Sequence, residues 1–377
     1  MKILQFGKAY PPANLGGVEV VIQLLTEGLN DSNIVCDALG VNDKAEYKEE
    51  TYKNGIIYKS KLIIKKFSTL FSLQVIQILR KIQNNYDILH VHSPDPMAAI
   101  ALFLTRPKVP IVLHWHSDIL RQKFFLFFYT PLLKWMMKRS SVIIATSPNY
   151  IKGSKLLNSF KDKCQVVPIG INIQKSDFKI EENRFLFLKE KNIIFSLGRL
   201  AYYKGFEYLI QAATLLPEDS IVVIAGEGEE REKLEKIIKN NKLEHKVILP
   251  GKITDAEKDF LFKNAKIFAL SSIFKTEAYA IVQVEALSYG LPIVSTKIPG
   301  SGVDWVNLDN LTGITVEIMN AVELGQAINK IINDKELYKA FSKNAFNRYK
   351  NELTRDIMIY KTVSIYKNIL HVYTKKN

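Results

Sequence analysis

Short, continuously apolar runs alternate along the chain with longer segments whose apolar residues recur at helical spacing. In the first half, the apolar runs cover residues 3–6, 87–92, 111–115 and 142–145, and residues 18–29 have the helical spacing. Continuous apolar runs are typical of strands that are buried on both faces of a parallel sheet. Their alternation with helices predicts βαβ units.

The same alternation starts again after residue 190. Predicted strands cover residues 193–197, 221–225, 247–249, 267–270 and 293–295, and predicted helices cover residues 205–216, 229–240, 256–264 and 280–289. The predicted fold class is therefore α/β, with two tandem doubly wound (Rossmann-like) parallel-sheet domains. Ligands of such sheets bind outside the carboxyl ends of the strands, so two facing domains would hold a ligand in the cleft between them.

A charged, weakly periodic stretch at residues 172–191 separates the two halves. We place the linker at 176–190, between an N-terminal domain at 1–175 and a C-terminal domain at 191–355. We expect the C-terminal helix, 356–377, to pack back on the N-terminal domain. The length of 377 residues agrees with this division, because a domain has roughly 100–200 residues.

Composition excludes several classes of protein. A chain with 47% hydrophobic and 24% charged residues is typical of a globular protein, not of a disordered or fibrous one. The two cysteines, Cys36 and Cys164, are far apart, which excludes a disulfide framework and is consistent with a reducing cytosol. The N-terminal apolar run is too short for a signal peptide. The most apolar stretch, 124–133, has about half the ~20 residues that cross a bilayer.

The formal net charge of +14 is concentrated in the first half, where residues 1–175 have 23 Lys and Arg against 12 Asp and Glu. Such an excess attracts nucleic acid, an anionic lipid surface or a phosphorylated substrate, although solubility alone also explains it. Two stretches, 59–66 and 121–139, combine cations with apolar or aromatic residues. This pattern favours an anionic membrane surface. The alternative is a core helix with snorkelling lysines.

Two common phosphate-binding motifs and one metal motif are missing. The chain has no Asp-x-Asp pair to hold a metal-bound diphosphate, and no Gly-x-x-x-x-Gly-Lys-Ser/Thr loop. Gly226 and Gly228 follow a predicted strand, but the third glycine of a dinucleotide fingerprint is absent. The sequence therefore does not support a P-loop enzyme or a Rossmann dehydrogenase.

Two glycine-containing loops between a strand and a helix are candidates for anion binding. Gly16 and Gly17 precede the first helix, where backbone N–H groups point at a ligand, although a plain helix start has the same pattern. Gly198, Arg199 and Lys204 follow the strand at 193–197. An arginine and a lysine in such a loop can bind a diphosphate without a metal. The alternative is two solvated loop cations.

Glu277 and Glu285 lie eight residues apart, the first in a loop and the second inside an apolar helix. A buried carboxylate needs a partner, which ribose hydroxyls, backbone or a lysine can supply. The N–H groups of Ala278, Tyr279 and Ala280 at that helix start can hold a phosphate. His116 ends the strand at 111–115, at the edge where ligand-binding residues collect. We interpret three further histidines as structural, because no carboxylate spacing indicates zinc: His90, His92 and His114.

In their order and spacing, these motifs resemble the GT-B glycosyltransferases of family 4 (glycosyl transferases group 1), over essentially the whole chain. Residues 113–119 and 145–150 resemble bacterial mannosyl- and rhamnosyltransferases of O-antigen and capsule synthesis. The resemblance implies that Arg199 and Lys204 bind the donor diphosphate, with Gly17 close to the phosphate. By the same resemblance, His116 and Glu277 contact the donor sugar and Glu285 the ribose. Gly226, Gly228, Lys252 and Ile253 would flank the base.

The resemblance implies a retaining hexosyltransferase that needs no metal and no other cofactor. GDP-mannose is the favoured donor, ahead of GDP-rhamnose and UDP-sugars, and the acceptor is a lipid-linked or polysaccharide glycan. The enzyme would be cytoplasmic and peripheral on the inner face of the plasma membrane. An epimerase or phosphorylase of the same fold remains an alternative. We expect no nucleic-acid partner, because the aromatics cluster with Leu and Met instead of forming a base-stacking pattern. Residues 299–304 stand where many family members have two glycines followed by a glutamate. Because this loop departs from that pattern, we assign no role to Asp304.

Overall fold

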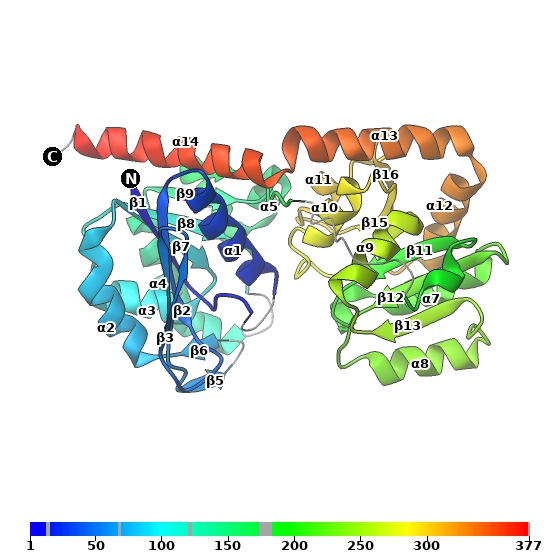
Figure 1. Cartoon of the computed structure of the whole chain (residues 1–377), viewed down its shortest axis with the longest axis horizontal. Coiled ribbons are helices and arrows are strands. Elements are labelled where there is room, and N and C mark those ends of the chain that lie inside the picture. Colours follow the sequence, from blue (N-terminus) through cyan, green and yellow to red (C-terminus); the bar gives the residue numbers. More distant parts are fainter. Residues whose placement is uncertain (13–15, 67–68, 120–122, 173–182, 376–377) are drawn as a thin grey trace. The chain divides into compact units, whose positions relative to one another are not determined.

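The computed structural model describes residues 1–12, 16–66, 69–119, 123–172 and 183–375 (Figure 1). The chain forms two compact units. The first contains Met1–Gly170 together with Arg355–Asn377, and the second contains Ile171–Thr354. The predicted linker, 176–190, therefore falls within the second unit. Its residues 176–182 lie outside the described part of the chain, whereas Phe185 and Leu188 are buried.

The first unit is built on an eight-stranded sheet in the order β10-β9-β8-β7-β1-β2-β4-β3. All neighbouring strands are parallel except β3 and β4, which are antiparallel at the edge. The strands are β1 (Lys2–Phe6), β2 (Val35–Val41), β3 (Lys48–Tyr52), β4 (Gly55–Ser60), β7 (Ile88–Ser93), β8 (Ile111–Trp115), β9 (Val142–Ala145) and β10 (Cys164–Val166); a separate antiparallel pair is formed by β5 (Ile64–Lys66) and β6 (Thr69–Phe71).

Helices cover both faces of this sheet (Figure 1). They are α1 (Gly17–Asp31), α2 (Leu73–Ile82), α3 (Pro96–Thr105), α4 (Lys123–Arg139), α5 (Pro148–Gly153), α6 (Lys155–Asn158) and α14 (Arg355–Thr374). Asp95 begins α3 by accepting hydrogen bonds from the N–H groups of Met97 and Ala98 at 2.9 and 3.3 Å. Pro96 occupies the first helical position, where its missing N–H costs nothing.

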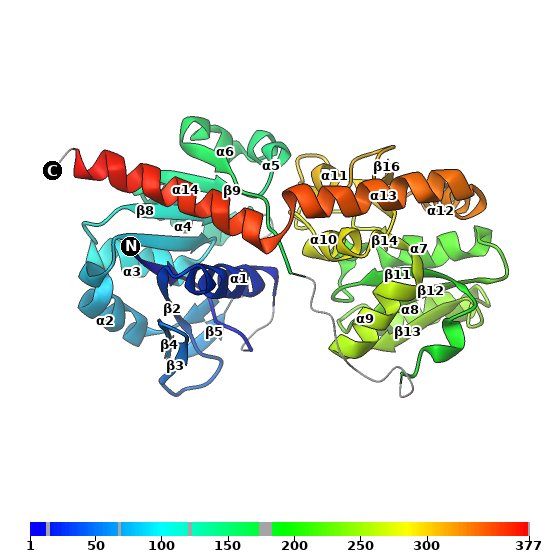
Figure 2. The same cartoon turned by 45° about the horizontal axis from the view of Figure 1, so that its top comes forward.

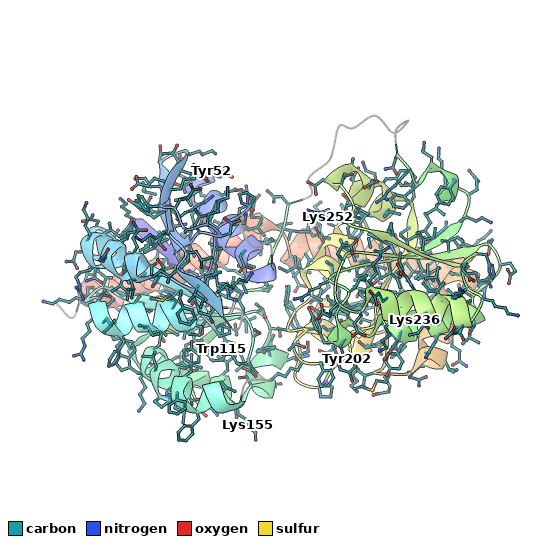
Figure 3. All side chains as sticks on the ribbon, turned by 90° about the horizontal axis from the view of Figure 1, so that it is seen from below. Tyr52, Trp115, Lys155, Tyr202, Lys236 and Lys252 are labelled. Atoms are coloured by element: carbon teal, nitrogen blue, oxygen red, sulfur yellow. The ribbon has the colours of Figure 1, made fainter. Side chains whose placement is uncertain are left out.

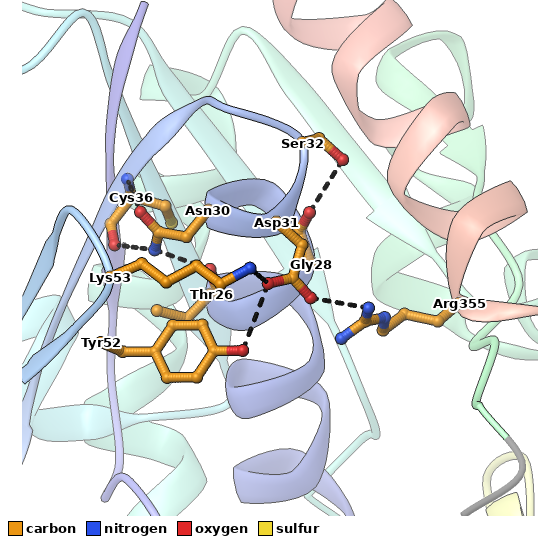
Figure 4. Close-up of polar contacts among 9 residues, drawn as sticks. All are labelled: Thr26, Gly28, Asn30, Asp31, Ser32, Cys36, Tyr52, Lys53 and Arg355. Carbon is orange, nitrogen blue, oxygen red and sulfur yellow. Dashed lines mark hydrogen bonds and ion pairs between the residues drawn. The ribbon is translucent and has the colours of Figure 1, made fainter.

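The C-terminal helix α14 packs on α1 within the first unit (Figure 2). A side chain at Gly28 of α1 would lie 2.7 Å from Ile359 Cδ1, so glycine is what lets the two helices approach this closely. Arg355, the first residue of α14, donates to the Asp31 carboxylate at 2.7 Å, and Tyr52 and Lys53 contact the same carboxylate (Figure 4). Asp31 therefore holds the start of α14 against α1.

The second unit has a six-stranded, fully parallel sheet in the order β13-β12-β11-β14-β15-β16. Its strands are β11 (Asn192–Leu197), β12 (Ser220–Ala225), β13 (Val247–Gly251), β14 (Ala265–Leu270), β15 (Ile293–Lys297) and β16 (Gly313–Glu317). The strand order reverses between β11 and β14. In such sheets this reversal opens a crevice at the carboxyl ends, where ligands bind.

The helices of the second unit are α7 (Phe206–Ala212), α8 (Arg231–Asn240), α9 (Asp255–Asn264), α10 (Ile281–Ser288), α11 (Val303–Val306), α12 (Ala321–Asn333) and α13 (Lys335–Glu352). One buried cluster packs α7, α8 and α12 on the central strands through Leu209, Leu234 and Ile328. The predicted fold class, two doubly wound α/β domains, is confirmed. Across the described ranges, no helix combines the length and the hydropathy that a bilayer crossing requires.

Candidate active site

The loop after β11 places a lysine over a glycine. Gly205 has a positive φ of 59° directly before α7, and a side chain there would meet the Ser271 carbonyl oxygen at 2.3 Å. Only glycine accepts both conditions. The turn at residues 202–204 directs Lys204 back across Gly198, whose added Cβ would lie 3.1 Å from Lys204 Nζ. Gly198, which the sequence places in a candidate anion-binding loop, thus also makes room for Lys204.

Lys204 and Glu277 form a buried ion pair across the two loops where the strand order reverses. Lys204 Nζ lies 2.5 Å from Glu277 Oε2, and the two side chains are only 8% and 11% exposed. Ser272 Oγ donates to the same carboxylate oxygen at 3.0 Å. Burial by itself lowers the pKa of Lys204, but the charge of Glu277, the nearby Tyr203 and the hydrogen bond to Glu277 together raise that pKa above its usual value. The structure therefore joins two residues to which the family resemblance assigns separate roles, Lys204 at the diphosphate and Glu277 at the sugar.

Arg199 behaves differently from Lys204, although both follow β11. Its side chain is 69% exposed, and its guanidinium lies 3.0 Å from Glu229 Oε2. An exposed pair of this kind adds little stability, so Arg199 can leave Glu229 for another anion at small cost. The loop therefore offers one fixed cation and one movable cation.

Gly226 and Gly228 allow two loops to pack backbone against backbone. A side chain at Gly226 would lie 2.0 Å from the Gly198 carbonyl oxygen, and one at Gly228 would lie 2.2 Å from that of Leu200. Leu200 N–H also donates to the Glu227 carbonyl at 2.9 Å. Loop packing is thus sufficient to require both glycines.

The turn predicted to flank the base follows β13. Lys252 is exposed and Ile253 is half-buried, and Figure 3 shows Lys252 and Tyr202 in the second unit. The Lys252 carbonyl accepts a hydrogen bond from Arg184 at 3.3 Å. Arg184 thus holds the backbone of Lys252, and the exposed Lys252 side chain is accessible to a ligand.

Ala278, Tyr279 and Ala280 precede the first residue of α10, which begins at Ile281, one residue later than the sequence predicts. Ala280 has a positive φ of 60°, unusual for a residue with a side chain. The segment is anchored from the loop after β15, because Gly302 N–H donates to the Ala278 carbonyl at 2.8 Å and Ser301 Oγ to the Glu277 carbonyl. N–H groups at a helix start have no partner inside the helix, so this position suits an anion.

Glu285 lies on α10 and takes its ion-pair partner from the neighbouring helix α9. Lys258 Nζ is 3.1 Å from Glu285 Oε1, and the Glu285 side chain is 22% exposed. Burial lowers the pKa of Lys258, but Glu285 and Asp255 together raise it above its usual value. Glu285 and Glu277 thus each hold a lysine of their own. Sequence reasoning found both carboxylates but missed their partners. Lys258 and Ser301 are distant in sequence from them, and Ser272, although only five residues from Glu277, belongs to no motif that marks it.

The N-terminus of α1 carries a carboxylate of its own. Gly16 precedes α1 in an extended conformation, and its added Cβ would lie 2.7 Å from Glu19 Oε2. Glu19 is only 8% exposed, and burial raises its pKa. The positive end of the α1 dipole stabilises an anion. Glu19 already supplies a carboxylate there, at the place where a phosphate bound at Gly16 or Gly17 would be stabilised in the same way.

His116 directly follows β8 and is 7% exposed. Its Nε2 lies 2.8 Å from His92 Nδ1, and its N–H donates to the Ser93 carbonyl at 2.8 Å. The loop beyond it is held by Asp118, which accepts from Trp115 Nε1 at 3.1 Å and from Ser154 Oγ at 2.7 Å. Burial lowers the pKa of His116 well below its usual value, so the ring is neutral at pH 7.

The three histidines interpreted as structural are fully buried beside His116. These are His90, His92 and His114. Each offers one ligand atom, and these atoms lie within 4.8 Å of one another, so this group among the described residues is close enough to share a metal ion. Both ring nitrogens of His90 and of His92 already have hydrogen-bond partners. A metal ion would have to displace these hydrogen bonds, and the structural role of the three histidines stays a prediction.

The amino-acid sequence matches two glycosyltransferase family models and several curated glycosyltransferases. Residues 177–348 match Glycosyl transferases group 1, and residues 15–175 match Glycosyltransferase Family 4. O-antigen chain mannosyltransferase C of Escherichia coli is 28% identical over 98% of this chain and 99% of its own. D-rhamnosyltransferase WbpZ of Pseudomonas aeruginosa is 28% identical over 94% of this chain and 92% of its own.

Solved structures show the same fold. Anabaena HepE in complex with UDP has a TM-score of 0.77 and 18% identity, over 98% of this chain and 100% of that chain. Sucrose-phosphate synthase from Thermosynechococcus elongatus has a TM-score of 0.77 and 16% identity, over 99% and 100% of the two chains. With both units matched by glycosyltransferase families, this chain belongs to the group 1, family 4 glycosyltransferases and has their GT-B fold.

Proposed function

We propose that this glycosyltransferase moves a hexose from a nucleoside diphosphate sugar, with GDP-mannose as the favoured donor, to a lipid-linked or polysaccharide acceptor during the synthesis of a bacterial surface glycan. The buried Lys204–Glu277 pair carries the proposal, because it joins a cation for the diphosphate to a carboxylate for sugar hydroxyls. It lies on the two loops where the strand order of the second unit reverses. The name of one relative that matches along nearly its whole length supports mannose and O-antigen synthesis, and the other such relative is named a rhamnosyltransferase.

In the proposed mechanism, the departing diphosphate takes up the negative charge that develops in the transition state. Arg199, Lys204 and the N–H groups of residues 278–280 stabilise that charge without a metal. The bond between the anomeric carbon and the diphosphate breaks while the acceptor hydroxyl approaches from the same face and gives its proton to the departing phosphate oxygen. The new glycosidic bond therefore forms on the face that the diphosphate leaves, and the sugar retains its anomeric configuration. In this proposal Glu285 holds the ribose, and Lys252 and Ile253 border the base. The family resemblance assigns Gly17 to the phosphate and His116 to the donor sugar.

A screen of donors followed by product analysis tests the proposal. Full-length protein is heated with GDP, UDP, GDP-mannose and UDP-glucose, because a ligand that binds only the folded state raises the melting temperature. We expect the largest rise with GDP-mannose. With a polyprenyl-diphosphate-linked saccharide added, mass spectrometry should detect an acceptor heavier by one hexose. A free epimerised sugar, or a sugar phosphate, would instead identify an epimerase or a phosphorylase.

We further propose that the first unit docks on the inner face of the plasma membrane. Phe127 and Phe128 on α4 are 76% and 65% exposed, and Lys134 and Lys138 on the same helix are exposed too. Exposed aromatics with cations suit an anionic bilayer surface. Lys59 contributes nothing to such a surface, because it is buried and paired with Glu50 at 2.7 Å. In the stretch 121–139, residues 121–122 lie outside the described residues. In the stretch 59–66, Lys61 and Lys65 are exposed cations.

Vesicle co-sedimentation tests the docking. We expect the protein to sediment with vesicles of phosphatidylglycerol and not with vesicles of phosphatidylcholine. Phe127→Ser with Phe128→Ser should abolish sedimentation, whereas Tyr360→Ser should not, because Tyr360 is 77% exposed in the same unit but lies on α14. Equal sedimentation with both lipids would refute an electrostatic surface. A salt-dependent shift of a nucleic-acid probe would point to a different partner.

A further inference from the structure

The imidazoles of four histidines form a compact group along the neighbouring strands β7 and β8 and the residue after β8. His90 and His92 lie on β7, His114 lies on β8 opposite His92, and His116 follows β8. The His114 and His116 rings stack with their centroids 4.4 Å apart, and those of His92 and His116 are 5.1 Å apart. Burial keeps all four neutral. Each ring therefore has one nitrogen that donates and one that accepts a hydrogen bond.

Gln5 on β1 determines which nitrogen of His92 carries the proton. His92 Nε2 lies 2.8 Å from Gln5 Oε1, and a carbonyl oxygen can only accept. The proton of His92 is therefore on Nε2, and its Nδ1 has the lone pair. Since that Nδ1 is 2.8 Å from His116 Nε2, His116 must donate from Nε2. Nδ1 of His116 is then left as an acceptor.

The same polarity continues on the far side of Gln5. Gln5 Nε2 donates to the Tyr366 hydroxyl at 3.4 Å, and this hydroxyl hydrogen-bonds His90 Nδ1 at 2.5 Å. His90 Nε2 in turn lies 3.1 Å from His114 Nδ1. His114 Nε2 has no hydrogen-bond partner in the described part of the chain. All these bonds can therefore point one way, from His116 to His114, and bonds aligned in series strengthen one another.

We propose that Gln5 and His92 are positioning residues that hold His116 in the Nε2–H tautomer, so that its Nδ1 accepts a hydrogen bond from a sugar hydroxyl. The assignment rests on the proposed function, which places His116 beside a sugar. This tautomer distinguishes between two ligand groups. Its Nδ1 can accept a hydrogen bond from a sugar hydroxyl, but it cannot donate one to a phosphate oxygen. Among the described residues, His116 forms its hydrogen bonds through ring Nε2 and the backbone N–H.

Nuclear magnetic resonance of the full chain labelled with ¹⁵N-histidine tests the tautomer directly. Of the six histidines, His116 is assigned by the signal missing from His116→Gln. We expect the wild-type spectrum to show the proton on Nε2 of both His116 and His92 at pH 7.5. A proton on Nδ1 of His116, the polarity that the opposite orientation of the Gln5 amide would impose, overturns the proposal.

Gln5→Met tests the cause, with Gln83→Met as the matched control. Gln83 is a second buried glutamine of the first unit, and its amide nitrogen donates to the Thr105 carbonyl at 3.4 Å. In Gln5→Met, we expect the two ring-nitrogen shifts of His116 to move toward each other as the tautomers mix. Gln83→Met should leave them in place. An unchanged His116 spectrum in a folded Gln5→Met overturns the proposal, and if that variant does not fold, the wild-type spectrum decides alone.

Kinetics adds a readout that separates this inference from the proposed function. Gln5→Met should lower kcat/KM for the sugar donor by about three- to tenfold, the worth of one hydrogen bond, with the affinity for GDP unchanged. An equal loss in Gln83→Met would show a general effect on the fold and would overturn the positioning role. A chain without transferase activity would refute the proposed function, while the spectra would still report the tautomer.

Discussion

Lys204 Nζ lies 2.5 Å from Glu277 Oε2, and both side chains are buried. The two residues come from the loops after β11 and β14, the strands between which the order of the sheet reverses. A buried cation is stable only with an anion beside it, so Glu277 keeps Lys204 charged before any ligand arrives. A diphosphate that reaches Lys204 thus meets a cation that is already desolvated and fixed.

Replacing Lys204 should weaken the fold and the donor site together. Lys204→Met leaves Glu277 buried without its cation, which should cost about 3–5 kcal/mol in urea unfolding of the second unit. GDP affinity should fall at least about tenfold, measured by titration calorimetry. Lys233→Met is the control, because its side chain is 48% exposed and its loss should cost under about 1 kcal/mol. If Lys204→Met with Glu277→Gln is no more stable than Lys204→Met alone, the pairing is wrong.

Arg199→Ala should reduce donor turnover without affecting stability. Its guanidinium is 69% exposed and contacts Glu229, so unfolding should change by less than about 0.5 kcal/mol. A lost charge-assisted contact of about 1.5–3 kcal/mol should lower kcat/KM at least about tenfold. Glu229→Gln serves as the control, because it releases Arg199 without removing it and should leave turnover close to wild type. An unchanged rate in Arg199→Ala would exclude its role at the diphosphate.

Glu285 should distinguish ribose from deoxyribose. A carboxylate that accepts from ribose hydroxyls should make the wild type prefer GDP over 2′-deoxy-GDP by about tenfold in affinity. Glu285→Gln should reduce this preference to about twofold or less, as measured by thermal shift or calorimetry. Glu235→Gln is the control, because Glu235 lies on α8 and is paired with Arg231 at 2.9 Å. A preference retained in Glu285→Gln would place the ribose elsewhere.

Local sequence patterns predict the central strands well, because burial on both faces produces a local signal. The run at residues 111–115 coincides with β8, and residues 142–145 coincide with β9. The edge strand β3 is largely exposed and polar, so it has no apolar run to reveal it. The sequence therefore shows where the sheet is buried on both faces, and says less about its edges.

The candidate site is predictable only in part, because its contacts join residues that are distant in sequence. Alternation along β7 places His90 and His92 on one face, but the register that sets His92 opposite His114 is a property of the sheet. Likewise, the strand–turn–helix pattern indicates a ligand loop at Arg199 and Lys204. It does not reveal that Lys204 binds Glu277, since that contact requires β11 and β14 to be neighbours.

Removal of divalent metal should leave the transferase active. The proposed site stabilises the diphosphate with Arg199, Lys204 and backbone N–H groups, and a charge-assisted hydrogen bond to each cation is worth about 1.5–3 kcal/mol. Activity measured after dialysis against EDTA should therefore stay within about twofold of the untreated enzyme. Arg199→Ala assayed with and without Mg²⁺ is the control, since a metal-free site gains nothing from the ion. Complete loss in EDTA that Mg²⁺ restores would contradict the proposal.

The buried histidines should make the first unit sensitive to acid. The folded protein keeps their pKa values below the usual value near 6.5, with that of His114 lowered to about 3 by burial. Below pH 6.5 the unfolded chain thus binds more protons, and stability falls as pH falls. At pH 5.5 each such histidine costs about 1.4 kcal/mol. Four histidines together approach the whole stability of a domain, about 5–15 kcal/mol. The first unit should therefore unfold between about pH 4 and 5.5.

Proton uptake during acid unfolding tests whether the histidines cause this transition. Trp115 and Trp135 report on the first unit and Trp305 on the second, so single-tryptophan variants can follow each unit separately by fluorescence. His114→Phe keeps the ring and removes one titrating group, and should lower the number of protons taken up by about one. His245→Asn is the control, because His245 is exposed in the second unit. Equal proton uptake in wild type and His114→Phe, or earlier unfolding of the second unit, would show that other groups control the acid transition.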